Sequence, residues 1–243
     1  MKSKVLTMFL ALLVPGLMLT AQEPGTEKSP VNIGADLSTA YIWRGIELGN
    51  GPAIQPWGEL SLKGFAFGTW GSYEIAGNFN EIDLYARYTL KSFSVSFVDL
   101  FFPGYEGLDQ NYFNFKNSTT GHCSEVGLSF NGNEKFPLSI YGGIIVYGRA
   151  IDTNPDDPES INHSAYVELK YTISKGDYTF NIFSGMCTGK SLLYGTTRAG
   201  VCNLGASSQK TIKITDTFSV PFKVALTSNP VMKKAYLTVT ASF

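Results

Sequence analysis

The sequence has little of several features on which other protein classes depend. Three cysteines among 243 residues are an odd number, so they cannot form a complete disulfide framework. Nineteen basic residues against 20 acidic ones exclude a polycationic chain that would bind nucleic acid through its net charge. Beyond the N-terminus, no uninterrupted apolar run approaches the roughly 18 residues that a membrane-spanning helix needs. If the chain crosses a membrane, it must therefore cross with strands.

Residues 1–21 have the pattern of a secretory signal peptide. Lys2 and Lys4 precede the apolar run 5–14, and the small residue Ala21 ends the segment, which predicts cleavage directly after it. An N-terminal anchor helix is the alternative, but a Pro-Gly pair interrupts the apolar run. Removal of this segment leaves 17 basic residues (19 minus 2) against 20 acidic ones, a net charge of about −3.

Alternation between apolar and polar residues is abundant, and it is clearest at the C-terminus. Successive side chains of a strand point to opposite faces, so the last nine residues form one apolar and one hydroxylic face. The two faces are Ala235, Leu237, Val239, Ala241 and Phe243 against Tyr236, Thr238, Thr240 and Ser242. An unpaired strand at the edge of a soluble sheet invites aggregation, whereas a closed barrel gives the last strand a partner on each side.

The same alternation predicts twelve strands in all. They are expected at about residues 33–43, 54–63, 65–75, 81–90, 93–97, 123–130, 137–148, 165–173, 178–182, 202–214, 218–226 and 235–243. A soluble β-sandwich also alternates with period two, but its strands average about five or six residues, and several strands here keep the pattern for longer.

The connections between the expected strands support a closed membrane barrel. Short turns, such as 63–64 and 91–92, alternate with longer loops, such as 101–121 and 149–160, and this rhythm is typical of outer-membrane barrels. The sequence therefore predicts an all-β fold: a transmembrane antiparallel up-and-down β-barrel of about 12 strands over residues 32–243. A short periplasmic leader is expected at 22–31.

Two motifs in the first half of the chain resemble a known family. The segment 41–45 (Y-I-W-R-G) and the segment 81–85 (E-I-D-L-Y) are similar to motifs of the TorF-type porin family of Gram-negative bacteria, and 210–230 resembles barrel proteins of Bacteroidota. The terminal Phe243 resembles the assembly signal of outer-membrane barrels. The resemblance implies a porin in the cell outer membrane that contacts outer-membrane lipid and the barrel-assembly machinery, and it supplies neither a substrate nor catalytic residues.

In a membrane barrel the polar parity of each strand faces the interior, so the charges on this parity are expected to line a pore. Small hydrophilic solutes or ions would pass by diffusion, with selectivity set by these charges. Both signs occur, so opposing charges can pair inside and narrow the passage. The expected pore-lining residues are Asp36, Arg44, Glu59, Lys63, Glu74, Glu81, Asp83, Arg87, Glu125, Glu168 and Lys170.

An outer-membrane barrel enzyme of the acyl hydrolase or protease type is the main alternative, and a non-conducting structural or adhesive barrel is another. Nucleophilic acyl transfer needs a base beside the nucleophile, usually histidine. Parity places His122 on the face of Val126, and His163 on the face of Ala165 and Val167. Both histidines should therefore point outward near the loop rim, solvated or at the headgroup level. We expect no catalytic residues, no enzymatic activity and no cofactor.

Two further patterns are weak. Asp152, Asn154 and Asp156 resemble the start of a calcium loop, but a proline interrupts them and the glycine and final glutamate of the motif are absent, so no metal site is expected. Cys187 and Cys202 flank one outer loop, and a disulfide between them is compatible with an oxidising compartment.

Overall fold

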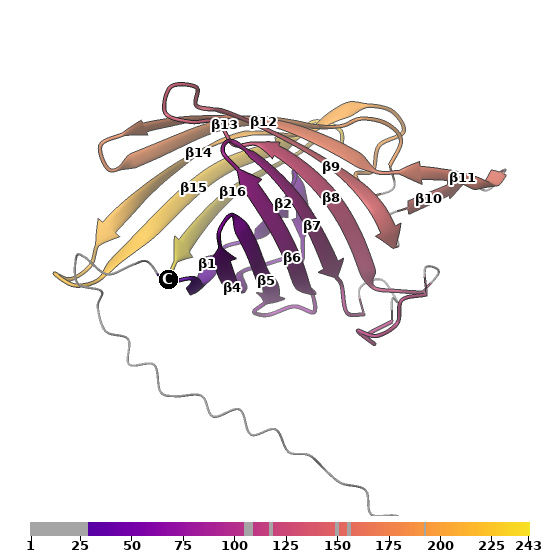
Figure 1. Ribbon diagram of the computed structural model, residues 1–243, viewed down its shortest axis with the longest axis horizontal. Helices are drawn as coiled ribbons and strands as arrows, with labels where there is room; N and C mark the ends of the chain where they lie inside the picture. The colour runs from indigo at the N-terminus through magenta and orange to yellow at the C-terminus, as the bar shows by residue number, and fades with distance from the viewer. Residues whose placement is uncertain (1–28, 105–108, 117–118, 149–150, 155–156, 192) are drawn as a thin grey trace, which may run out of the picture.

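The chain forms a closed barrel of twelve antiparallel strands, in agreement with the sequence-based prediction (Figure 1). A computed structural model describes residues 29–104, 109–116, 119–148, 151–154, 157–191 and 193–243, so the predicted signal peptide and most of the predicted leader lie outside it. The barrel strands are β1 (Val31–Ser38), β4 (Ala53–Leu62), β5 (Phe65–Glu74), β6 (Asn80–Leu90), β7 (Phe93–Phe101), β8 (His122–Phe130), β9 (Leu138–Gly148), β12 (Ala165–Lys175), β13 (Tyr178–Cys187), β14 (Gly200–Lys213), β15 (Ser219–Asn229) and β16 (Lys234–Ser242).

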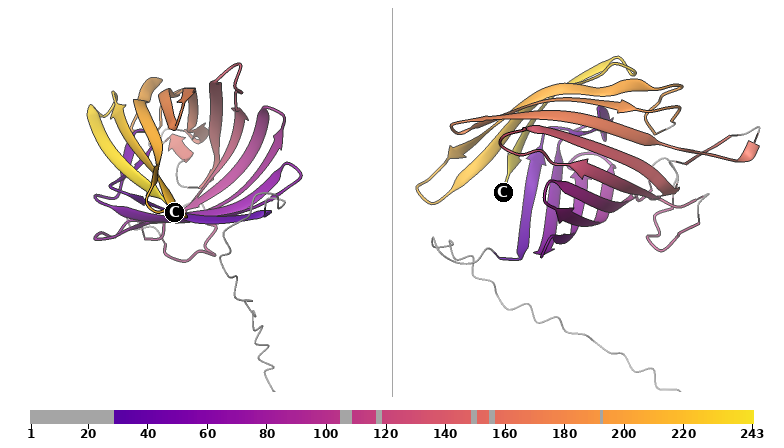
Figure 2. Two further views of the ribbon diagram at one scale, coloured as in Figure 1. Left: turned by 90° about the vertical axis from the view of Figure 1, so that its left-hand side faces the viewer. Right: turned by 45° about the horizontal axis from the view of Figure 1, so that its top comes forward.

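The barrel closes by pairing its first strand with its last. Leu37 of β1 is opposite Ala241 of β16 on one side and opposite Ile54 of β4 on the other. On its second edge β16 pairs with β15, where Leu237 is opposite Leu226. Each remaining strand pairs with the barrel strands before and after it in the chain, and Figure 2 shows the resulting ring. The C-terminal strand therefore has a partner on each edge, as predicted.

The apolar parity of the strands faces outward. Leu84, Leu128 and Leu237 are 46%, 65% and 70% exposed, although each lies within a paired strand. On the opposite parity, Glu81 of β6 and Thr240 of β16 are buried. The alternation in the sequence thus separates an apolar exterior from a polar interior. Among the described residues, no helix is long and apolar enough to cross a membrane.

The two ends of the barrel differ in their connections. One end carries tight turns, and at the β4–β5 turn Lys63 and Gly64 have φ angles of 48° and 89°. Two consecutive positive φ angles match the right-handed twist of a hairpin, which explains the glycine. The opposite end carries the longer connections that follow β1, β7, β9 and β13.

The predicted strand over 33–43 is wrong in its second half. β1 ends at Ser38, and the chain then forms a separate hairpin of β2 (Tyr41–Trp43) and β3 (Ile46–Leu48), which pair only with each other. The physical reason is a bend at residues 39–40, where the Ser38 hydroxyl donates to the carbonyl oxygen of Ala40 at 2.8 Å, so that the following residues leave the barrel wall.

Arg44 and Gly45 form the tip of the β2–β3 hairpin. Their φ angles are 48° and 79°, a left-handed pair that favours glycine at the second position. Gly45 also meets a steric limit, because a Cβ atom there would lie 2.0 Å from the carbonyl oxygen of Cys202 on β14. The hairpin tip therefore approaches the backbone of a strand that is distant from β1 around the ring.

A second hairpin lies within the segment expected to be a plain loop. β10 (Ile151–Asn154) pairs with β11 (Asp157–His163), and this hairpin projects beyond the barrel rim in Figure 1. The expectation of a loop over 149–160 was wrong in this respect. Asp156 and the side chains of Asp152 and Asn154 lie outside the described part of the molecule.

Candidate functional site

Arg44 at the tip of the β2–β3 hairpin joins the hairpin to the opposite wall of the barrel. Its Nη1 and Nη2 atoms donate hydrogen bonds of 2.6 and 2.7 Å to the two carboxylate oxygens of Glu125 on β8. Nη1 also donates to the hydroxyl of Tyr194 at 2.6 Å, and Nη2 to that of Tyr141 at 3.2 Å. Such a two-pronged pair fixes orientation as well as distance. The hairpin thus extends across the interior from β1 to β8 and β9.

Aromatic rings enclose the Arg44 guanidinium group. Its central carbon lies 4.6 Å from the ring centroid of Trp43, 4.5 Å from that of Tyr166 and 5.1 Å from that of Tyr141. Tyr194 stacks on Trp43 and on Tyr166, with centroid distances of 5.7 and 5.5 Å. A cation over aromatic faces is stabilised by the ring quadrupoles, more so when it is shielded from water. We call Trp43, Arg44, Glu125 and the three tyrosines the arginine cluster.

The arginine cluster is buried yet balanced in charge. The side chains of Arg44 and Glu125 are only 13% and 4% exposed. Burial alone lowers the pKa of Arg44, but Tyr194 and Glu125 beside it outweigh this effect and raise the pKa above its ordinary value. Arg44 therefore keeps its positive charge in the interior, where it forms an ion pair with Glu125.

Other contacts hold the hairpin at two further places. At the tip, Asn229 of β15 donates its side-chain amide to the carbonyl oxygen of Gly45 at 3.1 Å. On the other side, the ring of Tyr41 lies 5.1 Å from that of Trp70 on β5 and 6.2 Å from that of Phe79. Contacts to β5, β8, β9 and β15 surround the hairpin, so it occupies part of the barrel cross-section.

A polar cavity of about 310 Å³ lies against the hairpin. Asp36 and Lys223 contribute opposite charges, and hydroxyl and amide groups make up most of the remaining wall. The lining residues that carry polar side chains are Asp36, Ser38, Tyr41, Arg44, Gln55, Asn203, Ser207, Lys223, Thr227, Thr238 and Thr240. The cavity can therefore hold water and small polar solutes.

A second ion pair lies nearer the end that carries the tight turns. Arg87 of β6 donates to the carboxylate of Glu59 on β4 at 2.9 Å, and Tyr85 and Ser61 donate to the same group at 3.0 and 2.7 Å. The Arg87 side chain is 43% exposed and that of Glu59 is 19% exposed. Opposing charges thus pair in the interior both here and in the arginine cluster.

Glu81 and Asp83 of β6 form an acidic pair that has no basic partner among the described ion pairs. Glu81 is fully buried and Asp83 is 8% exposed. Both carboxylate oxygens of Glu81 and Oδ1 of Asp83 make no hydrogen bond within the ordinary limits of distance and angle among the described residues. Tyr41 lies beside them, and burial, followed by the charges of Glu81 and Asp83, raises the pKa of Tyr41 well above its ordinary value.

The other predicted pore-lining residues have varied positions. Asp36 lines the polar cavity, and Glu168 accepts hydrogen bonds from Tyr166 and Asn203. Glu74 accepts the backbone amides of Asn50 and Phe79 and so ties two loops together at the rim. Lys63 is exposed in the β4–β5 turn, and Lys170 is exposed on β12.

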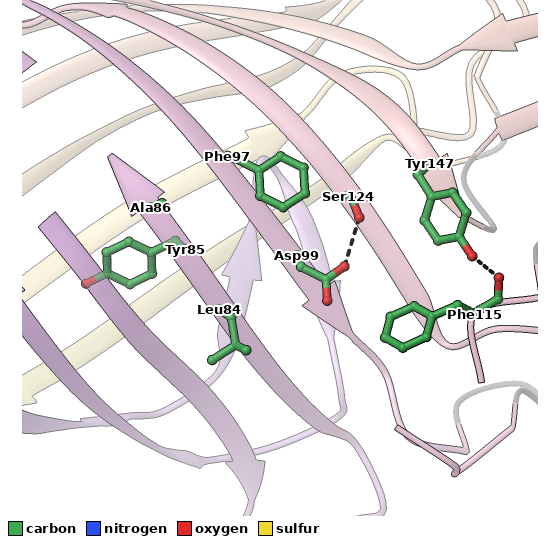
Figure 3. A pocket seen from close by; sticks show the side chains of 8 residues that line it. All are labelled: Leu84, Tyr85, Ala86, Phe97, Asp99, Phe115, Ser124 and Tyr147. Atoms are coloured by element: carbon green, nitrogen blue, oxygen red, sulfur yellow. Dashed lines mark hydrogen bonds between the residues drawn. The ribbon is translucent and has the colours of Figure 1, made fainter. Parts of the chain in front are cut away.

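The outer face carries a pocket of about 410 Å³ near the loop rim, shown in Figure 3. Leu84, Ala86, Phe97 and Phe115 make it largely apolar, and Asp99 and Ser124 add polar groups. In Figure 3 the Ser124 hydroxyl points to Asp99, to which it donates a hydrogen bond of 2.8 Å. This pocket lies on the parity that faces away from the interior.

His122 lies behind this pocket and differs from its prediction. It was expected to be solvated at the rim, yet it is fully buried and stacks on Phe115 at 4.6 Å. Its Nδ1 lies 2.7 Å from Asp99 Oδ2 and its Nε2 lies 2.7 Å from the carbonyl oxygen of Tyr112. The connection between β7 and β8 covers the histidine, which periodicity could not reveal. His163 is exposed, as expected for a rim residue, and its Nδ1 lies 2.7 Å from the carbonyl oxygen of Ile145.

The remaining candidates from the sequence are the cysteine pair and the calcium-like pattern, whose side chains lie outside the described residues. Cys187 and Cys202 are buried and do not form a disulfide with each other, and Cys123 is buried as well. Within the described residues, no group of three histidine, cysteine, aspartate or glutamate side chains is arranged to hold a metal ion. The part of Tyr141, Tyr166 and Tyr194 in the arginine cluster could not be predicted from the sequence, because it depends on their contacts with Arg44, which is distant in the chain.

Comparisons with known proteins give no family assignment. No protein-family model matches the chain, and a search of curated proteins finds no match either.

Proposed function

We propose that this protein is an outer-membrane barrel through which small hydrophilic solutes or ions diffuse passively, along an interior that the β2–β3 hairpin narrows. The polar cavity beside the hairpin is the observation that carries the proposal. A barrel interior lined by hydroxyl, amide and charged groups offers a path for hydrated solutes, and its wall charges set selectivity. The arginine cluster makes this path narrower than that of an open barrel.

The exterior supports a location in the membrane. Apolar side chains such as Leu84, Leu128 and Leu237 are exposed around the outside of the barrel. An apolar surface of this extent is costly in water and is compatible with a lipid environment. The predicted signal peptide, the terminal Phe243 and the resemblance to TorF-type porins agree with the outer membrane of a Gram-negative cell. Outer-membrane lipid and the barrel-assembly machinery would then be its partners.

The charge of Arg87 offers a direct test of conduction through the interior. The purified protein is refolded, inserted into a planar bilayer and studied under a salt gradient, so that the reversal potential reports ion selectivity. We expect Arg87→Glu to shift the reversal potential toward cations without abolishing current, because Arg87 is a partly exposed charge of the interior. Arg87→Gln should give a smaller shift in the same direction.

Lys116 provides a matched control for this experiment. It is an exposed cation in the connection between β7 and β8, outside the barrel interior. Lys116→Glu changes the total charge by the same amount as Arg87→Glu, but it should leave the reversal potential almost unchanged. Absence of current from the wild-type protein, or equal shifts from both variants, would refute passage along the Arg87 wall.

The group of Ser124, His122 and Asp99 near the rim does not support the enzyme alternative. The Ser124 hydroxyl donates to Asp99, while the two ring nitrogens of His122 face Asp99 and the carbonyl oxygen of Tyr112. A catalytic base must lie within hydrogen-bond reach of the nucleophile. Neither nitrogen of His122 is directed to Ser124, so we propose no hydrolytic activity for this group.

A further inference from the structure

The acidic pair on β6 is buried in the barrel interior, and no ion pair between described residues includes it. Glu81 is fully buried, and neither of its carboxylate oxygens makes a hydrogen bond within the ordinary limits of distance and angle among the described residues, although Tyr41 and Asp83 lie beside it. Asp83 lies two residues further on the same strand, so its side chain is on the same face, and its Oδ1 has no partner either. An ionised carboxylate that is removed from water without a partner is strongly disfavoured. The pair must therefore either take up a proton or bind a cation.

Basic side chains in the described structure do not supply this compensation. The Arg44 and Arg87 guanidinium groups are paired with Glu125 and Glu59, respectively. Lys213 pairs with an aspartate in the β14–β15 turn, and no ion pair between described residues includes Glu81 or Asp83. The two carboxylates together carry two negative charges when both are ionised, which is the charge that one divalent cation neutralises.

The groups around the acidic pair are oxygen donors of the kind that bind hard cations. Ser72 of β5 is opposite Glu81 in the strand register, and its hydroxyl accepts a hydrogen bond of 3.3 Å from the side-chain nitrogen of Gln55. That contact uses the side-chain nitrogen of Gln55, so the side-chain oxygen of Gln55 is left to bind a cation. The hydroxyl of Tyr41 lies on the hairpin side of the pair. Carboxylate, carbonyl and hydroxyl oxygens suit calcium, which tolerates irregular geometry better than magnesium does.

The polar cavity gives a route to this position. Tyr41 and Gln55 both line the cavity. Tyr41 lies beside the acidic pair, and Gln55 contacts Ser72, which is opposite Glu81 in the strand register. A cation that enters the interior therefore has polar groups along its path until it reaches Glu81. A site needs such an entry path as well as its ligands.

We propose that Glu81 and Asp83 form a binding site for one divalent hard cation, with calcium as the best fit, beneath the β2–β3 hairpin. The cation neutralises both carboxylates, and oxygen atoms from Tyr41, Gln55 or water complete its coordination. This site does not depend on passage of solutes through the barrel, so it can exist whether or not the barrel conducts. The alternative to a bound cation is a proton shared between the two carboxylates, as occurs in other pairs of neighbouring carboxyl groups.

Cation binding can be measured on the full-length mature protein refolded in detergent, after chelation of metals and at constant ionic strength. Calcium is added, and the thermal unfolding midpoint and the heat of binding are recorded. In parallel, terbium luminescence is excited through the aromatic side chains, since Trp70 is opposite Asp83 in the register and its ring packs on Tyr41. We expect calcium to raise the unfolding midpoint and to displace terbium from the wild-type protein.

Glu81→Gln and Asp83→Asn test the assignment without a change of size. Each should weaken the calcium affinity by at least about tenfold and reduce the terbium signal. Glu59→Gln is the matched control, because Glu59 is also an interior carboxylate but is paired with Arg87. The control should bind calcium as the wild type does. In the absence of divalent cations, Glu81→Gln should be at least as stable as the wild type, because it removes an uncompensated charge.

Three results would overturn the proposal. The first is a wild-type protein that binds neither calcium nor terbium. The second is binding that Glu81→Gln and Asp83→Asn leave unchanged. The third is a stability that responds to pH through Glu81 and Asp83 but not to divalent cations, which would assign a shared proton to the pair.

Discussion

Replacement of Arg44 by methionine tests whether the β2–β3 hairpin restricts the barrel interior. Glu125 is 4% exposed, and loss of the Arg44 cation leaves it with the hydroxyl of Tyr141 as a donor. Removal of one partner from a buried ion pair costs about 3–5 kcal/mol. Since about 1.4 kcal/mol is a tenfold change in an equilibrium constant, the ratio of displaced to docked hairpin should rise by roughly two to three and a half powers of ten.

Single-channel recording in a planar bilayer measures this ratio as the fraction of time spent in a state of higher conductance. We expect Arg44→Met to reach that state far more often than the wild type does. Arg198→Met is the matched control, because Arg198 is an exposed arginine in the connection between β13 and β14. It should behave as the wild type does.

The double variant Arg44→Met/Glu125→Met adds a test of the reasoning behind the magnitude. It removes both charges and keeps side chains that pack against Trp43 and Tyr166, so no buried carboxylate is left without its cation. Its high-conductance fraction should therefore lie closer to that of the wild type than the fraction of Arg44→Met does. If Arg44→Met conducts as the wild type does, the hairpin does not obstruct the path, and the reasoning fails.

Two further predictions concern the outside of the barrel. Leu84→Arg should destabilise the barrel in lipid by about 2–4 kcal/mol, measured by urea titration, because a charge at a strand-centre position of the outer face contacts lipid. Ser207→Arg is the control, because Ser207 lines the polar cavity, and it should destabilise the barrel much less. His122→Ala removes hydrogen bonds to a carboxylate and a carbonyl group, a loss of about 1.5–3 kcal/mol. The connection that covers it should then be cleaved by chymotrypsin at least about tenfold faster, whereas equal cleavage rates would show that His122 does not hold it.

Periodicity in the sequence predicts the barrel well because it depends on local rules. A strand with one face toward the exterior and one toward the interior must alternate, and β6 does so from Glu81 to Tyr88. The turns at Lys63-Gly64 and Lys91 lie where short connections between alternating segments are expected. Closure through β1 and β16 follows from the need to pair the last strand.

The hairpin could not be predicted in the same way. Alternation continues from Ile33 to Trp43 with only Ala40 and Ile42 as apolar residues on the polar parity, and this weak irregularity marks the place where the chain leaves the wall. What holds the hairpin in the interior is contact with residues that are distant in sequence. Arg44 meets Glu125 and Tyr194 at separations of 81 and 150 residues. A single sequence carries no local signal for such contacts.

The burial of His122 was unpredictable for a related reason. The strand register places it on the outer parity, and this part of the expectation agrees with its position opposite Phe101. Whether a residue on the outer face is exposed to solvent depends on the path of the nearby connections. Here the connection between β7 and β8 places Tyr112 and Phe115 against the imidazole ring of His122. Loop paths are determined by tertiary contacts rather than by periodicity.

The position of the hairpin also has a consequence for the order of folding. Its segment lies close to the N-terminus, but its docking surfaces belong to β8, β9 and β15, and Asn229 holds Gly45 across 184 residues of chain. These surfaces come together only when most of the ring has formed, so an early stage of assembly contains a free hairpin and an unobstructed centre. Closure of the ring and docking of the hairpin are then late events, and such long-range contacts are formed slowly. The hairpin is thus an element that is synthesised early and reaches its native position late.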